Sequence, residues 1–335
     1  MDYRVFQFNI LKLIDFYPSK RLFRYFPRIL MYHRFGAQDA WRGLGATFLE
    51  AHIKTIRKDF NTVSLKELST RLRNGDIVLP NTVVFTVDDG YRDFYHYAYP
   101  IFRKYDVPAT VYVTTDFVDR KVWLWPDVIQ YILDKTRFQS YTATFVNRAM
   151  RFSLIGEGSK RLAWNDIADY CLTLKTVRRE EFIKELSNNL KVLVPASPVP
   201  EFEALSWDQI REMKQHKIDF GSHTCTHPRL VMTEGEALHY EIEGSKRRIE
   251  EMIGERIDSF CYPNGTRKDF DEKIKEIVKN SGYRCATMAY WDSKPDDLFE
   301  LGRYGVGSDM QHFEKVIYGM EFVSTLVRKK LRENP

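Results

Sequence analysis

Short apolar runs alternate with amphipathic stretches along most of the chain. Runs rich in β-branched and aromatic residues predict buried strands at residues 28–33, 82–87, 109–115, 218–223, 259–263 and 284–289. Between them, apolar residues at helical spacing predict helices at 47–60, 64–75, 93–105, 207–217, 233–253 and 270–282. Ser64 is a natural N-cap and Gly75 a natural stop for the second helix. This alternation predicts an α/β protein with a parallel sheet or a (β/α) barrel.

The alternation is interrupted between residues 118 and 204. This part contains Trp123 and Trp125, basic helical patches and a proline-rich stretch at 192–200. We interpret 118–204 as a helical and loop insertion that ends in a linker and shapes the mouth of a site on the barrel, itself formed by 28–117 and 205–318. Either tryptophan is expected to offer a face to a sugar ring or to anchor the insertion to the barrel.

Both ends of the chain are basic. Residues 1–27 alternate aromatic and basic side chains, and residues 319–335 include the stretch RKKLREN, which we predict to be a helix. Such segments either lie on a membrane surface or pack against the barrel as helices. No run of about 18 apolar residues occurs, and no cleavage site follows the N-terminal segment. We therefore expect a cytoplasmic protein, with peripheral contact to the inner face of the membrane if the termini bind lipid.

The composition is that of an ordinary globular protein, with 44% hydrophobic and 29% charged residues. The net charge of +5 comes from 51 basic and 46 acidic residues, and no tight basic run indicates a nucleic acid partner. The charge is compatible with anionic glycolipids, nucleotide sugars or a membrane surface. Four cysteines form no C-x-x-C pair, and Cys261 and Cys285 lie in strand-like stretches, so we expect buried thiols rather than a disulfide scaffold.

Two adjacent carboxylates follow the predicted strand 82–87, in the sequence FTVDDGYRD. Asp88 and Asp89 would stand at the strand end, where catalytic residues of a β/α barrel gather. Adjacent residues on a loop can diverge, so that one faces a metal and the other a substrate. The alternative is an ordinary tight turn built on Asp-Gly.

Two histidines stand at and just beyond the end of the predicted strand 218–223, in the sequence GSHTCTHP. His223 and His227 are four residues apart, a spacing at which both rings can reach one ion in a helical turn. The alternative is a pair of surface histidines. Together with one carboxylate, the two imidazoles would form a three-ligand metal site with an open position for water. The second aspartate would then be free to act as a base.

These motifs, with the turn YPNG at 262–265, resemble the polysaccharide deacetylase family, the NodB-homology fold of carbohydrate esterase family 4. The resemblance covers about residues 28–310 apart from the insertion. It implies a distorted (β/α) barrel of about seven strands and a divalent metal, usually zinc. Residue by residue, it implies that Asp88 is the catalytic base, that the Tyr262 backbone N–H helps to form the oxyanion hole, and that the metal ligands are Asp89, His223 and His227.

The chain departs from the best-known members at two positions. Their third motif carries an arginine that pairs with the base, whereas Cys261 lies in that region here. Arg303 is our candidate replacement, and an ordinary salt-bridged arginine is the alternative. Their general acid comes from a late Leu-x-His motif, which His312 matches poorly. Instead, MYHRF resembles the early Met-Tyr-His of the poly-N-acetylglucosamine deacetylase branch, which makes His33 the candidate acid, with a core histidine at a strand end as the alternative.

The resemblance predicts a metal-dependent hydrolase that removes an N-acetyl group from a carbohydrate. The expected substrate is a lipid-linked, nucleotide-linked or oligosaccharide intermediate of surface-polysaccharide or glycolipid assembly. An O-acetyl esterase or deformylase of the same fold is one alternative. A non-catalytic carbohydrate-binding module and a metal-free cyclic-amide hydrolase are two others, and the intact Asp88, Asp89, His223 and His227 argue against both.

Overall fold

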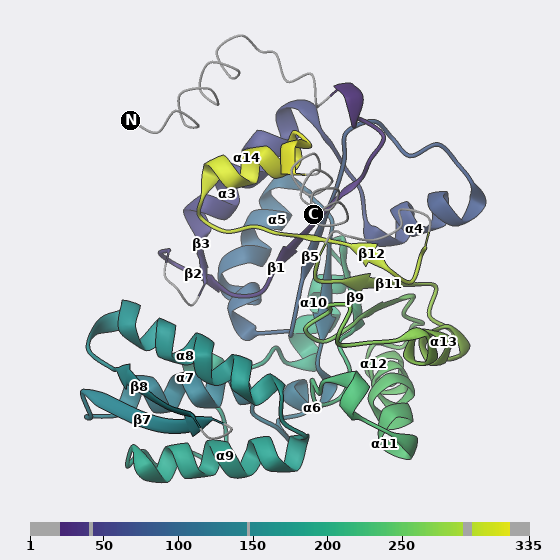
Figure 1. The fold of residues 1–335 in the computed structure, drawn as a ribbon. Coiled ribbons are helices and arrows are strands. Elements are labelled where there is room, and N and C mark those ends of the chain that lie inside the picture. Colours follow the sequence, from purple (N-terminus) through teal and green to yellow (C-terminus); the bar gives the residue numbers. More distant parts are fainter. Residues whose placement is uncertain (1–20, 40–42, 146–147, 291–296, 322–335) are drawn as a thin grey trace, which may run out of the picture.

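A curved parallel sheet forms the centre of the computed structural model, which describes residues 21–39, 43–145, 148–290 and 297–321 (Figure 1). Within these ranges the sheet has nine strands: β1 (Arg28–Tyr32), β4 (Asn61–Thr62), β5 (Thr82–Val87), β6 (Ala109–Val113), β9 (Ile218–Ser222), β10 (Ser259–Cys261), β11 (Cys285–Met288), β12 (Leu301–Gly302) and β13 (Tyr304–Gly305). A further short pair, β2 (Phe35–Gly36) and β3 (Leu44–Gly45), lies apart from it.

The segment from Leu301 to Gly305 closes the sheet into a barrel. Its first part, β12, pairs with β11, and its second part, β13, pairs with β1, with only Arg303 between the two. Counted as one strand, and with the short edge strand β4 set aside, this segment completes a ring of seven parallel strands. The prediction of a distorted barrel of about seven strands is therefore confirmed.

The strands are buried on both faces, which explains their continuous apolar sequences. Every residue of β5 and β6 is buried. One face of the ring points into the barrel and the other is covered by helices, as Figure 1 shows for α3 and α5. Phe85 of β5, for example, packs edge-on against Phe102 of α5 with ring centroids 5.3 Å apart.

The helices around the barrel are α3 (Ala46–Asp59), α4 (Leu65–Asn74), α5 (Tyr99–Tyr105), α6 (Thr115–Val118), α10 (Trp207–Lys214), α11 (Gly235–His239), α12 (Ser245–Ile253), α13 (Glu272–Asn280) and α14 (Met310–Ile317). They agree in place with the predicted helices, except that the sequence analysis did not predict α6 or α14. Short 3-10 turns occupy η2 (Pro200–Phe202) and η3 (Leu230–Met232). The side chain of Ser64 accepts a hydrogen bond from the Glu67 N–H at the start of α4, and Gly75 ends that helix with φ 72°.

Two predicted helices contain a π-helical turn. Residues Phe94–Ala98 form η1 immediately before α5, and Tyr240–Gly244 form η4 between α11 and α12. A π turn inserts an extra residue into the helix and changes which side chains face inward. The uniform 3.6-residue period that the sequence predicts for 233–253 therefore does not hold across Tyr240–Gly244.

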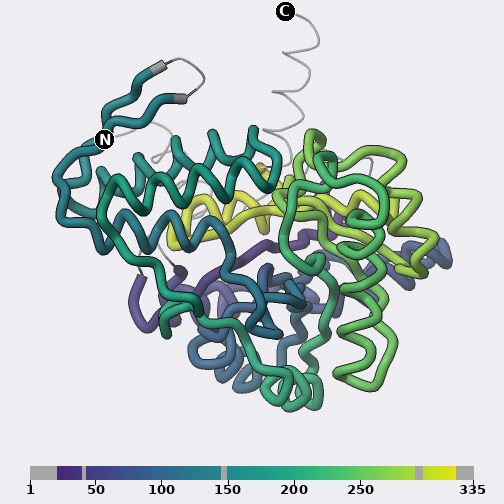
Figure 2. Tube along the Cα trace, turned by 90° about the horizontal axis from the view of Figure 1, so that it is seen from below, coloured from purple at the N-terminus to yellow at the C-terminus, as the bar shows by residue number. Residues whose placement is uncertain are grey.

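The insertion is a small layered unit beside the barrel. It contains α7 (Trp125–Lys135), the antiparallel hairpin β7 (Ser140–Phe145) and β8 (Arg148–Ser153), α8 (Gly156–Leu172) and α9 (Thr176–Asn189). The hairpin corrects our interpretation of a purely helical and loop segment: strand pairing lets short, polar segments satisfy their backbone groups. The insertion has its own apolar core, which includes Ile129, Phe152, Ile167 and Leu186. In Figure 2 the hairpin projects from its outer edge.

The predicted terminal helices lie mostly outside the described residues, since residues 1–20 and 322–335 are not among them. Within the described part of the chain, none of the helices combines the length and apolar character needed to cross a bilayer.

Candidate active site

The predicted site residues gather at the carboxyl ends of the barrel strands, around a cavity of about 470 Å³. The two aspartates follow β5, the histidine pair follows β9, and Tyr262 follows β10. The cavity is lined by all seven residues that the sequence analysis assigned to catalysis or metal binding: His33, Asp88, Asp89, His223, His227, Tyr262 and Arg303. Parallel strands place their carboxyl ends on one side of the barrel, which explains the convergence of residues up to 270 positions apart.

Asp89, His223 and His227 form a cluster that fits one metal ion. Nε2 of His223 lies 3.5 Å, and Nε2 of His227 3.6 Å, from Oδ1 of Asp89. One potential ligand atom from each residue lies within 4.8 Å of the other two. Asp89 and His227 adopt left-handed backbone conformations, with φ of 73° and 58°. Such strain is uncommon outside glycine and tends to occur at functional sites.

The electrostatics of the two imidazoles also suit a metal. Nδ1 of His223 lies 2.9 Å from the carbonyl oxygen of Cys261, so a proton on that nitrogen leaves the Nε2 lone pair directed at the cluster. Burial, reinforced by nearby His223, lowers the pKa of His227 to about 4, so its ring is neutral. Neutral imidazoles and a carboxylate are borderline ligands for a divalent ion such as zinc.

The loop that carries the histidines is not the helical turn that their spacing suggested. Glu241, on the π turn η4, accepts hydrogen bonds at Oε2 from the backbone N–H groups of Cys225 (2.8 Å) and Thr226 (2.9 Å). Its Oε1 accepts from the Thr226 hydroxyl at 2.6 Å. A buried carboxylate therefore holds the bent loop whose two ends supply His223 and His227.

Asp88 pairs with Arg303 inside the barrel. The guanidinium donates from Nη1 to Oδ1 at 2.6 Å and from Nη2 to Oδ2 at 2.7 Å, a bidentate arrangement. Arg303 is 2% exposed and also donates to the Met288 carbonyl oxygen and the Thr86 hydroxyl. Burial alone would raise the pKa of Asp88, but the charge and hydrogen bonds of Arg303 outweigh it and hold that pKa well below its usual range. Asp88 is thus a fixed, ionised carboxylate.

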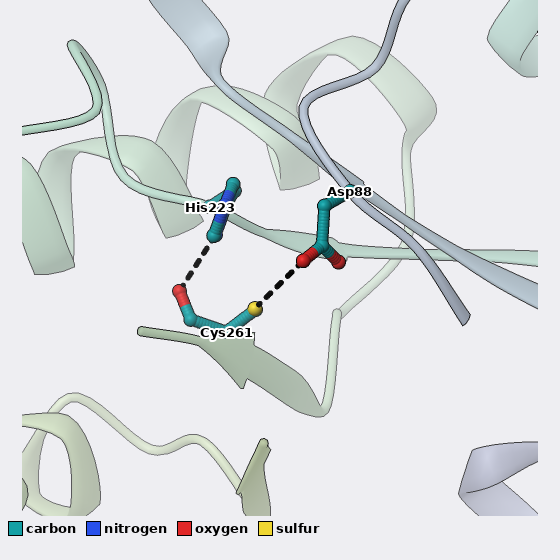
Figure 3. Close-up of side chains that lie close together, drawn as sticks. All are labelled: Asp88, His223 and Cys261. Carbon is teal, nitrogen blue, oxygen red and sulfur yellow. Dashed lines mark hydrogen bonds between the residues drawn. The ribbon is translucent and has the colours of Figure 1, made fainter. Parts of the chain in front are cut away.

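A second group of potential ligands, Asp88, His223 and Cys261, overlaps the first (Figure 3). Figure 3 shows the Cys261 carbonyl facing His223 and its thiol facing Asp88, with Sγ 3.8 Å from Oδ2. This group is the poorer metal site. Burial raises the pKa of the Cys261 thiol well above its usual range, and both oxygens of Asp88 are bonded to Arg303.

His33 lies at the end of β1, beside Asp88. Its Nε2 is 3.6 Å from Oδ2 of Asp88, and its side chain is 48% exposed. The ring is therefore a solvent-accessible group at the cavity rather than a core histidine. Its imidazole is a direct neighbour of the aspartate.

The backbone N–H of Tyr262 already has an acceptor, the carbonyl oxygen of Thr287 at 3.2 Å, because the ladder between β10 and β11 extends past the strand end. Asn264, two residues later, also lines the cavity and has φ 59°. Among the described residues, no hydrogen-bond acceptor pairs with the Asn264 N–H. The turn Pro263-Asn264-Gly265 is the sequence signal for this free N–H. Our sequence analysis had assigned the oxyanion-hole donor to the Tyr262 N–H instead.

Comparison with known proteins identifies the family to which the chain belongs. Residues 77–286 match the family described as Polysaccharide deacetylase. The chain belongs to the polysaccharide deacetylase family. It is 34% identical over 285 residues to YxkH of Bacillus subtilis strain 168, which carries a provisional polysaccharide deacetylase name. That alignment covers 84% of this chain and 72% of YxkH.

Solved deacetylase structures share the fold. The Streptococcus pyogenes deacetylase PplD, in complex with acetate, has 18% identity and a TM-score of 0.56, over 85% of this chain and 94% of PplD. IcaB from Ammonifex degensii has 16% identity and a TM-score of 0.58, over 87% and 96% of the two chains. A de-N-acetylase from Aggregatibacter actinomycetemcomitans has 17% identity and a TM-score of 0.54, over 86% and 99%. This polysaccharide deacetylase is therefore a hydrolase that removes acetyl groups from carbohydrates.

The insertion reaches the cavity of the deacetylase through residues that the sequence analysis missed. Neither expected tryptophan lines the cavity: the Trp123 ring packs on Tyr131 and Phe202, and Trp125 lies against the Arg179 guanidinium. In these contacts both rings pack on residues of the insertion itself, so neither the sugar face nor the anchor to the barrel is confirmed. The α8 residues Arg161, Trp164 and Asn165 line the cavity instead. Their i, i+3, i+4 spacing is a signal for one helix face, but the sequence does not indicate which face meets the barrel.

Proposed function

We propose that this deacetylase hydrolyses N-acetyl groups of a saccharide with zinc held by Asp89, His223 and His227. The observation that carries the proposal is the buried Asp88–Arg303 pair beside that cluster. It supplies an ionised carboxylate at a fixed position next to three ligands that leave room for further coordination.

A divalent metal at this position would lower the pKa of water and polarise the acetyl carbonyl. Asp88 then accepts the proton of the attacking water, while Arg303 keeps both carboxylate oxygens in place. The Asn264 N–H is our candidate donor to the carbonyl oxygen as negative charge develops there, in place of the Tyr262 N–H. Protonated His33 donates to the departing nitrogen, the C–N bond breaks, and acetate and an amine leave.

The position of His33 supports an amide rather than an ester substrate. An amine is a poor leaving group unless it is protonated, so an amide-cleaving site needs an acid near the base. His33 is exposed to solvent and lies 3.6 Å from Asp88.

We also propose, from the Met31-Tyr32-His33 motif, that the chain falls in the poly-N-acetylglucosamine deacetylase branch. A role in assembling a surface polysaccharide or glycolipid, at the inner face of the membrane, is part of the same proposal.

Mass spectrometry tests the proposal directly. Zinc-loaded protein is incubated with N-acetylated oligosaccharides and, separately, with O-acetylated and N-formylated analogues. The N-acetylated substrates should lose acetyl groups with release of acetate, and the metal-free protein should release none. Preferential cleavage of the O-acetyl or formyl analogue would assign the alternative activity. Equal acetate release by wild type and Asp88→Asn would contradict the role of Asp88.

A further inference from the structure

One face of α8 forms a wall of the catalytic cavity. Arg161, Trp164 and Asn165 stand at positions i, i+3 and i+4 of this helix, so they share one side of it. Gln130 of α7 lines the cavity beside them. These residues belong to the insertion, whereas the candidate metal ligands belong to the barrel. The insertion therefore lines the same cavity as the candidate metal ligands.

Arg161 differs from the other two arginines that line the cavity. Arg303 is paired with Asp88, and Arg34 donates from Nε to Asp93 at 2.5 Å. The guanidinium of Arg161 is exposed, and among the described residues no carboxylate pairs with it. A guanidinium presents a fork of donors that matches the oxygens of a carboxylate or phosphate. Arg161 thus offers an unused anion-binding group inside the catalytic cavity.

The charges of the cavity lining also favour an anion. Asp88 balances Arg303, and Arg34 lies between two carboxylates, Asp93 at 2.5 Å and Asp127 at 3.7 Å. With a divalent cation on Asp89, these four carboxylates, the three arginines and the cation would carry a net charge of +1. Burial raises the pKa of Asp127 to about 7, so protonation of that group would only make the cavity more positive. A positive cavity concentrates anionic substrates.

Aromatic rings in the same cavity suit a sugar. Trp164 donates its indole N–H to the carbonyl oxygen of Pro126 at 2.9 Å, which fixes the orientation of its ring. Tyr290, which follows β11 of the barrel, lines the cavity as well and is 61% exposed. Aromatic faces pack well against the apolar C–H faces of pyranose rings. The wall of α8 therefore combines a fixed aromatic ring with a free cation.

We propose that Arg161 and Trp164 form a subsite for an anionic group of the substrate, so that the deacetylase acts on a saccharide carrying phosphate or carboxylate next to the acetylated unit. This inference rests on the proposed function and adds the substrate class to it. A sugar phosphate, a sugar linked through a diphosphate, and a uronic acid share this chemistry.

Paired probes separate charge from size. N-acetylglucosamine is compared with N-acetylglucosamine 1-phosphate and UDP-N-acetylglucosamine, and chitotetraose with a hyaluronan tetrasaccharide. Zinc-loaded wild type should bind an anionic probe more tightly than the neutral probe with which it is compared. The anionic probe with the largest gain in affinity identifies the group that the subsite binds as phosphate, diphosphate or uronate. Arg161→Ala should raise the KM of that anionic substrate about tenfold more than the KM of its neutral counterpart, with similar kcat. Arg161→Lys should restore part of the difference.

Arg178→Ala is the matched control, because Arg178 is an exposed arginine of the insertion that pairs with Glu181 and does not line the cavity. Equal affinity of wild type for neutral and anionic probes would overturn the inference, as would the same loss for both in Arg161→Ala. Calorimetry with zinc-loaded Asp88→Asn measures these affinities without turnover. Failure of the proposed function would instead appear as no acetate release from any probe by wild type.

Discussion

Glu241 is predicted to set the metal affinity although it is not a metal ligand. Its carboxylate accepts three hydrogen bonds from Cys225 and Thr226, in the middle of the loop that ends in His223 and His227. The Thr224 hydroxyl oxygen accepts a further hydrogen bond from the His227 N–H at 3.0 Å. His227 has φ 58°, a conformation that its surroundings must stabilise. Without Glu241, the loop loses three of the hydrogen bonds that hold it.

The contacts determine the size of the effect. Glu241→Ala leaves the N–H of buried Cys225 and that of partly buried Thr226 without an acceptor. An unsatisfied buried donor costs about 1–3 kcal/mol, so the free energy of unfolding should fall by about 2–4 kcal/mol. Loss of groups that orient metal ligands lowers metal affinity by about 10–100-fold. Glu241→Gln keeps the shape and an oxygen acceptor, so it should lose about 1 kcal/mol and less than tenfold in affinity.

Two measurements separate these effects. Urea unfolding in the presence of a chelator gives the stability of the metal-free protein, and competition with a chromophoric chelator gives the zinc affinity. Glu243→Ala is the control, because Glu243 lies on the same π turn but is exposed and pairs with His239. A folded Glu241→Ala that binds zinc as tightly as wild type would refute the reasoning, as would equal effects of the two alanine variants.

Four other changes have defined outcomes. Asp88→Asn should keep zinc affinity and lower turnover about 10²–10⁴-fold, measured as acetate release, because it removes the base and spares the ligands. Arg303→Lys should also lower turnover while zinc remains bound, since a single ammonium cannot hold both oxygens of Asp88; unchanged turnover would leave Arg303 a structural role. His33→Ala should lower turnover on N-acetyl substrates about 10²-fold, and more than on an O-acetyl ester with a better leaving group. Burial lowers the pKa of His52 to about 4, so the unfolded chain takes up a proton below pH 6.5 that the folded chain does not. The contribution of His52 to the free energy of unfolding should therefore decrease by about 2 kcal/mol as the pH is lowered from 7 to 5, as measured by urea titration. A His52→Leu variant should lack this part of the pH dependence.

The sequence by itself determined the elements and the chemistry of the barrel. Strands such as Thr82–Val87 are continuous apolar runs, and α4 has its own cap and stop residues, so local pattern suffices to predict them. Asp88 and Asp89 directly follow one predicted strand, and His223 and His227 stand at and just beyond the end of another. Because parallel strands end on the same side of a barrel, these positions predict that the side chains lie at one end of it.

Tertiary structure decided what depends on contacts between distant segments. The pairing of Arg303 with Asp88 arises because the segment from Leu301 to Gly305 closes the ring between β11 and β1, and no local pattern records this closure. The role of Glu241 depends on a π turn that shifts its side chain toward the histidine loop. The face of α8 that meets the cavity depends on how the insertion docks. Local sequence sets the preferences of each segment, whereas these positions follow from packing between segments.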